Sequence, residues 1–289
     1  KALNMKAYFS DPVAGWEVID ATHDIYVPNQ FRGKGNGKMK PCGGYKVGTF
    51  SSSEYGQAFN AKNKYGYFGV AFRRKKDGVV VIYSAGTDIT NFDTLSAVAN
   101  AKSEAGFSKL LRNYCQVGQS FYEHVKEQHL EGREPNLFCA HSIGCVFNMW
   151  MNAVTKNEVL AVNFDGFGKG QQQLLQHSYR QLNRREIGDS KANIISITGS
   201  NNPLNHQGKN HPGARTKVDT DGGVFHKSRY NFSKHLIGRI SKALDKKFKA
   251  RHGMNSEDYS RREHALYVSG IYRANNKRPS KEENAVLKL

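Results

Sequence analysis

The feature that most constrains the fold is residues 135–145, whose sequence is PNLFCAHSIGC. Residues 137–140 form a short apolar run, which is typical of a buried strand. The run is followed by Ser142, and Gly144 comes two residues later. Apolar residues then recur at helical spacing through residues 146–154. The stretch therefore predicts a strand, a sharp turn and a helix, with one hydroxyl group placed at the turn.

This layout matches the nucleophile elbow, G-x-S-x-G, in which a tight turn lifts a serine side chain above the edge of a sheet. Small residues two positions before and after the serine let the strand and the helix pass close together. These positions hold Ala140 and Gly144, so the chain differs from the usual pattern by one methyl group. In the alternative interpretation, Ser142 only caps the helix that begins near Cys145. Because the flanking strand and helix are those that the motif requires, we favour Ser142 as a nucleophile.

The remaining chain alternates predicted strands with predicted helices. We expect strands at residues 65–72, 79–83, 137–140, 159–164 and 193–198. We expect helices around residues 92–99, 107–128, 145–154, 170–185 and 232–251. Strands that alternate with helices usually pair in parallel, so the sequence predicts an α/β fold. Its expected form is a three-layer sandwich with a mostly parallel central sheet, whose strand ends converge on one edge where ligands bind.

We divide the chain into a core domain at residues 65–252 and two flanking segments. Residues 1–64 are predicted to be a loop-rich segment packed on the core, because glycines and lysines crowd residues 33–44. Residues 201–230 are polar and rich in Gly, Asn and His, which predicts a long loop. Residues 253–289 are predicted to be a basic C-terminal extension.

The net charge of +18 is the strongest signal in the composition, and it is uneven. From Lys227 to the end the chain holds 16 Lys or Arg and 6 Asp or Glu, a net charge of +10. Such a surface favours anionic partners, namely phospholipid headgroups, nucleic acid or an acidic protein. Charge alone does not choose among them.

Several classes of site are not indicated by the sequence. No run of 18 apolar residues is present, so we expect no membrane span. No zinc, haem or dinucleotide pattern appears, so we expect no metal and no cofactor. The four cysteines favour a reducing compartment, or delivery into a host or target cell, over a disulfide-stabilised secreted protein. The sequence begins at Lys1 rather than Met, which leaves open what preceded it.

A serine nucleophile needs a histidine to take its proton and an acid to orient that histidine. In α/β hydrolases the chain order is Ser, acid, His, so the histidine should follow the last sheet strand. We prefer His235, which opens a predicted helix after the final loop, and His226 is the second choice.

Several segments resemble class 3 lipases. Residues 79–88 resemble the family's apolar strand followed by R-G-T, and residues 91–100 resemble the helix that comes next. Residues 140–144 resemble its G-H-S-x-G motif. Residues 163–168 resemble a strand that ends in a glycine turn, and residues 202–204 stand where the family has a D-P-V-like turn. The resemblance covers roughly residues 65–245. It implies an α/β-hydrolase-like sandwich and a serine hydrolase of the lipase or phospholipase type, which would cleave carboxylic esters of lipids and, given the charge, do so at an anionic membrane surface.

The acid and the oxyanion hole are less clearly marked. The resemblance places the acid at Asn202, which can orient a histidine but supplies no negative charge to stabilise imidazolium. Asp165, after the preceding strand, is the alternative that we slightly prefer. The oxyanion hole would use the N–H of Ile143 and a second donor at Thr87, which could also cap a helix.

A second function remains open at this stage. The chain would then be a catalytically weak or inactive α/β-hydrolase-like module that binds nucleic acid or an acidic protein through its basic surface. An activated serine separates the two functions, because it reacts with a fluorophosphonate and a helix cap does not.

Overall fold

The computed structural model describes backbone and side chains at residues 15–22, 50, 53, 67–86, 111–166, 180, 182, 192–200, 213–218, 239–256, 258–260 and 262–263. At residues 25–34, 38–47, 104–110 and 237–238 it describes the backbone alone. The helices expected at residues 92–99 and across most of 170–185 lie outside these ranges.

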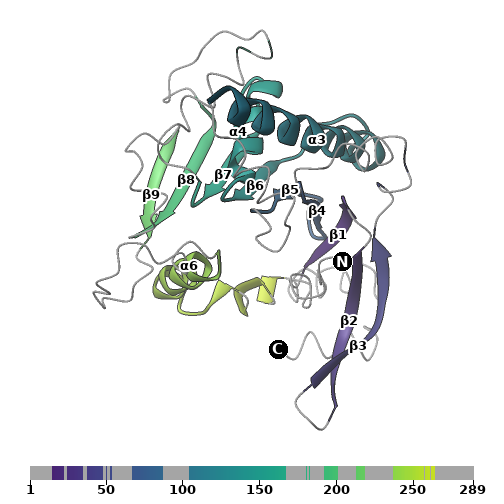
Figure 1. Ribbon diagram of the computed structural model, residues 1–289. Helices are drawn as coiled ribbons and strands as arrows, with labels where there is room; N and C mark the ends of the chain where they lie inside the picture. Colours follow the sequence, from purple (N-terminus) through teal and green to yellow (C-terminus); the bar gives the residue numbers. More distant parts are fainter. Residues whose placement is uncertain are drawn as a thin grey trace.

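The described chain is built around a seven-stranded sheet in the order β1-β4-β5-β6-β7-β8-β9 (Figure 1). The strands are β1 Trp16–Ala21, β4 Gly69–Arg74, β5 Val80–Ser84, β6 Leu137–His141, β7 Leu160–Phe164, β8 Ile194–Gly199 and β9 Ala214–Val218. Strands β5 to β9 pair in parallel, whereas β1, β4 and β5 pair in antiparallel fashion. The prediction of an α/β fold with a mostly parallel sheet is therefore confirmed. Strand β6, which leads to Ser142, lies at the centre.

Helices lie on both faces of this sheet. Helices α3 (Glu104–Leu130) and α4 (Gly144–Val154) cover one face, and α6 (Ile237–His252) lies on the other (Figure 1). Burial alternates along β5 accordingly. Val80, Ile82 and Ser84 are buried on the α3 side, while Tyr83 is half-buried on the side of α6. None of the helices in the described ranges is long and apolar enough to cross a membrane.

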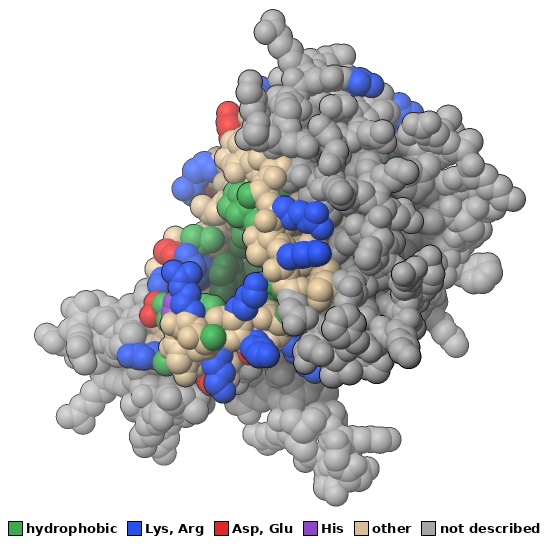
Figure 2. Space-filling view, turned by 90° about the vertical axis from the view of Figure 1, so that its left-hand side faces the viewer, with side chains coloured by type: hydrophobic (Ala, Val, Ile, Leu, Met, Phe, Trp, Pro, Cys, Tyr) green, Lys and Arg blue, Asp and Glu red, His purple; other side chains and the backbone are tan. Residues whose placement is uncertain are grey.

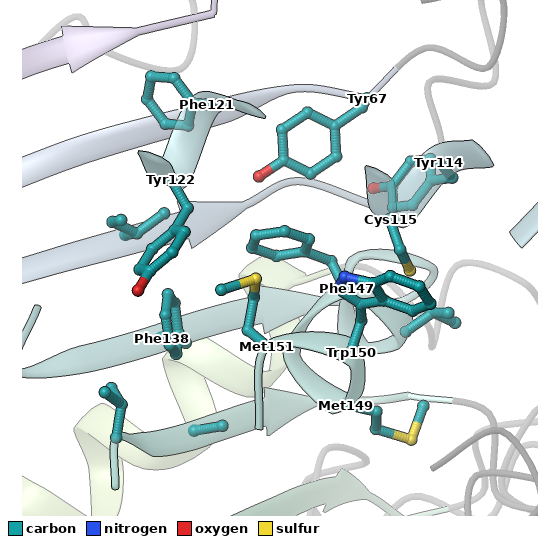
Figure 3. Packing of buried hydrophobic residues seen from close by; sticks show 14 of the residues in the cluster. Tyr67, Tyr114, Cys115, Phe121, Tyr122, Phe138, Phe147, Met149, Trp150 and Met151 are labelled. Carbon is teal, nitrogen blue, oxygen red and sulfur yellow. The ribbon is translucent and has the colours of Figure 1, made fainter. Parts of the chain in front are cut away.

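The core lies between α3, α4 and the sheet, and it is rich in aromatic residues (Figure 3). The apolar stripe predicted for α3 is buried there. Its described members are Leu111, Tyr114, Val117, Phe121 and Val125. Gly118 brings α3 close to its neighbours, because a Cβ atom at this position would lie 2.6 Å from the rings of Phe147 and Tyr67. The central strand and the turn that follows it therefore rest on a tightly packed layer.

The expectation of a loop at the glycines of residues 33–44 is wrong. Strands β2 (Ile25–Lys34) and β3 (Lys38–Val47) form a two-stranded antiparallel sheet, in which Gly33 pairs with Met39 and Pro28 with Gly44. Strand β1 also belongs to residues 1–64, but it pairs with β4 as part of the main sheet. Pairing uses backbone N–H and C=O groups, which glycine also carries, so a low strand propensity does not prevent it.

The expected long loop at residues 201–230 also contains a strand. Strand β9 pairs in parallel with β8 at the edge of the sheet. Four of its five residues are exposed and only Val218 is buried. An exposed edge strand needs no alternation of apolar and polar residues, so its sequence carries no periodic signal.

Candidate active site

Ser142 occupies a strained turn between the central strand β6 and helix α4. Its φ is 56°, in the left-handed region that residues other than Gly, Asn and Asp rarely adopt. The Ser142 N–H donates a hydrogen bond to the carbonyl of Phe164 on β7 (3.0 Å), and its own carbonyl accepts one from the N–H of Cys145 (3.1 Å). The backbone on both sides therefore holds the strained conformation, which is the geometry expected of a nucleophile elbow.

Two glycines make room for this turn. At Gly144 a Cβ atom would lie 2.5 Å from the carbonyl oxygen of Ser84 and 2.8 Å from that of Ala85, so no larger residue fits without movement of the backbone. At Gly86 a Cβ atom would lie 2.8 Å from Nδ1 of His141 and 3.0 Å from Cβ of Ser142. The turn after β5 is therefore packed directly against the elbow.

The structure does not favour Ser142 as the cap of α4. The capping position is held by Ile143, with φ of −62° and ψ of −28° and no side-chain cap bond. A capping serine would need an extended backbone at that position, whereas Ser142 lies one residue earlier and is left-handed.

Ile143 is placed as the oxyanion role requires. It follows Ser142 directly, at the N-terminus of α4, where the N–H groups have no partner within the helix and the helix dipole is positive. Within the described ranges its N–H donates no hydrogen bond, so it is available to a developing negative charge.

The turn that would supply the second oxyanion donor is anchored by two buried tyrosines. The hydroxyl of Tyr67 bonds to Oγ of Ser84 (2.9 Å), and the hydroxyl of Tyr114 donates to the carbonyl of Ala85 (3.3 Å). Burial raises the pKa of both phenols, so both stay protonated at neutral pH. Thr87, the donor predicted from the sequence, lies just outside the described residues.

Asp165 lies at the same edge of the sheet as Ser142. It follows β7, the neighbour of β6, and it is completely buried with φ of 48°. Its N–H donates to the carbonyl of Ile197 (2.9 Å), and its Oδ1 accepts from the N–H of Gly199 (2.7 Å). The carboxylate is thus fixed between the ends of β7 and β8.

The two cysteines beside the turn are not activated as nucleophiles. Burial raises the pKa of Cys139 to about 12. Burial, with a smaller contribution from the charge of Asp165, also raises the pKa of Cys145. Only the thiolate is a strong nucleophile, and at neutral pH both groups are thiols.

The other two triad candidates cannot be placed. Asn202 and His235 lie outside the described residues, as does His226. Helix α6 begins at Ile237, only two residues after His235, so the expected helix at this point is present.

A cavity with a basic rim adjoins the elbow, and the sequence did not predict it. Its volume is about 720 Å³, and it lies between the sheet and α6. Its apolar lining comes from Tyr83, Phe164, Ile240, Leu244 and Phe248, and its charged lining from Lys247, Arg251 and one acidic residue, Asp245. Figure 2 shows the hollow with hydrophobic side chains inside, and around it mainly Lys and Arg side chains with fewer Asp and Glu. The carbonyl of the lining residue Phe164 is the one that accepts the Ser142 N–H, so the cavity lies next to the turn.

The comparisons with known proteins add no relative. The sequence matches no protein-family model, and it matches no curated protein.

Proposed function

We propose that this protein is a serine hydrolase with an α/β-hydrolase-like three-layer sandwich, which cleaves carboxylic esters of lipids in the manner of a lipase or phospholipase. The observation that carries the proposal is the left-handed backbone of Ser142 at the end of the central parallel strand. Strained conformations of this kind cost about 1–3 kcal/mol and persist where function requires them.

The residues divide the chemistry as follows. The Ser142 hydroxyl attacks the ester carbonyl while His235 takes its proton, and His235 then returns that proton to the departing alcohol. The carboxylate of Asp165 orients the imidazole and stabilises its charged form. The N–H of Ile143, with Thr87 as second donor, meets the negative charge on the carbonyl oxygen. Water then attacks the acyl-serine with the same histidine as base, which releases the acid.

A conservative substitution tests which residue orients the catalytic histidine. Asp165→Asn keeps an oxygen that accepts from Gly199 but removes the charge, so ester hydrolysis should fall about 10³-fold or more with the fold retained. Asn202→Ala should cost far less. If instead Asn202→Asp raises kcat and Asp165→Asn has little effect, Asn202 is the orienting residue.

The lining of the cavity supports the proposal that the substrate is an amphiphile at an anionic surface. Its apolar lining suits acyl chains, and the Lys and Arg side chains around it suit anionic headgroups. Each basic residue near an anionic bilayer contributes about 1 kcal/mol of attraction. Lys247 and Arg251 line the cavity, and Lys242, Lys246 and Lys249 lie on the same helix, so reversible docking needs no hydrophobic anchor.

The experiment compares hydrolysis of one ester in anionic and in neutral vesicles. We expect faster hydrolysis in anionic vesicles. Lys247→Glu with Arg251→Glu should weaken vesicle binding by at least about 30-fold, because two attractive charges worth about 2 kcal/mol are lost and two repulsive charges replace them. The control, Lys75→Glu with Lys156→Glu, makes the same change in net charge at exposed positions away from the cavity and should bind almost as wild type.

Two outcomes would contradict this substrate surface. One is hydrolysis that is indifferent to the charge of the vesicle. The other is an equal loss of binding in both double variants, which would show that only net charge matters. Tight binding of short duplex DNA, together with no hydrolysis of any ester, would favour the nucleic-acid module instead.

A further inference from the structure

Three side chains from two distant segments converge on one point of the core, away from Ser142. Oδ2 of Asp20 on β1 lies 3.0 Å from Nε2 of His124 and 2.9 Å from Nε2 of His129, both on α3. The ligand atoms of the three side chains all lie within 4.8 Å of one another. Asp20 is fully buried, His124 is 4% exposed and His129 is 20% exposed. Because Asp20 and His124 are 104 positions apart, no sequence spacing indicated this cluster.

A β-bulge aims the carboxylate into the core. The pairing of β1 with β4 shifts between Val18 and Asp20, so that Ile19 is the extra residue. As a result Val18 and Ala21, three positions apart, pack in the same small cluster with Val70, whereas Asp20 between them faces the other side of the sheet, toward α3. Bulges of this kind often re-aim a side chain at a site.

The rest of the cluster is held rigidly. Oδ1 of Asp20 accepts hydrogen bonds from the N–H of Ala21 (2.8 Å) and of Phe50 (3.4 Å), which leaves Oδ2 directed at the two imidazoles. The ring of Phe50 packs edge-on against His124, at 5.2 Å between centroids. The guanidinium of Arg73 donates to the carbonyl of His129 (2.8 Å), which fixes the end of α3.

We propose that Asp20, His124 and His129 form a binding site for a divalent transition-metal ion such as Zn²⁺. Two imidazole nitrogens and one carboxylate oxygen are a common zinc donor set, with a fourth position open to water. Ligands about 2.0–2.1 Å from a tetrahedral ion lie about 3.3 Å from each other, so the separations between Asp20 and each histidine require shifts of only a few tenths of an ångström. The two imidazole nitrogens lie within 4.8 Å of each other, and rotation of their side chains would complete the geometry. On binding, each Nε2 that carries a hydrogen must move it to Nδ1 or release it.

The site lies apart from the proposed hydrolytic centre, and the role we infer for it is to stabilise the fold. Arg73, which contacts the carbonyl of His129, pairs with Val80 at the first residue of β5, whereas Ser142 follows the last residue of β6. The two sites therefore lie toward opposite ends of the parallel strands. An ion between β1 and α3 would fasten an edge strand of the sheet to the longest described helix, and it would stabilise the folded chain by mass action.

The test uses the full chain, stripped with a chelator and titrated with Zn²⁺ against a chromophoric competitor. We expect one zinc per chain. His129→Gln should weaken binding about 100-fold or more, because its amide can still donate to Asp20 but is a poor zinc ligand. The matched control is His252→Gln on α6, an exposed histidine outside the cluster, which should bind as wild type. Circular dichroism checks that each variant is folded.

Co²⁺ gives a readout that needs no variant. Wild type should show the visible absorption of tetrahedral cobalt without a thiolate charge-transfer band, since no cysteine belongs to the cluster. The proposal is overturned if wild type binds zinc no more tightly than His129→Gln. It is also overturned if cobalt shows only the weak octahedral spectrum. In either case the three side chains form a hydrogen-bonded network alone.

Discussion

Ser142→Ala should abolish ester hydrolysis and leave the fold intact. The hydroxyl is the proposed nucleophile, and loss of such a group lowers kcat by about 10⁶-fold in a well-studied serine hydrolase. Alanine keeps the Cβ atom, so the left-handed turn and its contact with Gly86 are unchanged. The measurement is kcat on a soluble aryl ester, with circular dichroism and thermal unfolding as controls for structure. Hydrolysis at the wild-type rate in this variant would exclude Ser142 as the nucleophile.

A second variant at the same position separates strain from chemistry. Ser142→Gly also lacks the hydroxyl, so it should be as inactive as Ser142→Ala. Glycine adopts a φ of 56° without penalty, so Ser142→Gly should be about 1 kcal/mol more stable than Ser142→Ala in chemical denaturation. Equal stability of the two variants would mean that the turn carries no strain.

His235→Ala should lower kcat by about three orders of magnitude or more, because it removes the general base. His226→Ala is the matched control, since it removes another histidine from the segment before α6 and should have little effect. The pair is measured on the same soluble ester, which avoids any change in vesicle binding. If His226→Ala is inactive and His235→Ala is active, the base is His226.

The sequence predicted those elements in which the order of apolar and polar residues follows the burial of the side chains. Helix α3 is long and buries one stripe of apolar residues, so its period of 3.6 is visible in the sequence. The strand before Ser142 is a short apolar run because the central strand of a parallel sheet is covered on both faces. The elbow was found because its geometry demands small residues at fixed positions around Ser142, and the contacts of Gly144 show why.

Other elements could not be predicted because backbone pairing, and not side chains, forms them. The hairpin of β2 and β3 contains glycines and prolines that usually mark loops, and β9 has four exposed residues. Strand β9 lies at the edge of the sheet, where a strand needs few apolar contacts.

The sites formed by segments far apart in the sequence could not be predicted either. The Asp20 cluster depends on a bulge in β1 and on the position of that strand beside α3. The cavity next to Phe164 exists only because α6 lies across the second face of the sheet. By contrast, the position of Asp165 at the same sheet edge as Ser142 was accessible to prediction, because carboxyl ends of neighbouring parallel strands meet at one edge.

The central claim is that Ser142 is an activated nucleophile, and covalent labelling with a fluorophosphonate tests it most directly. The probe is added to folded wild type and to Ser142→Ala, and the modified peptide is identified by mass spectrometry. We predict one label per wild-type chain, located on Ser142, with none on unfolded wild type or on the folded Ser142→Ala variant. A folded wild-type chain that takes no label, or takes it equally in Ser142→Ala, would contradict the account.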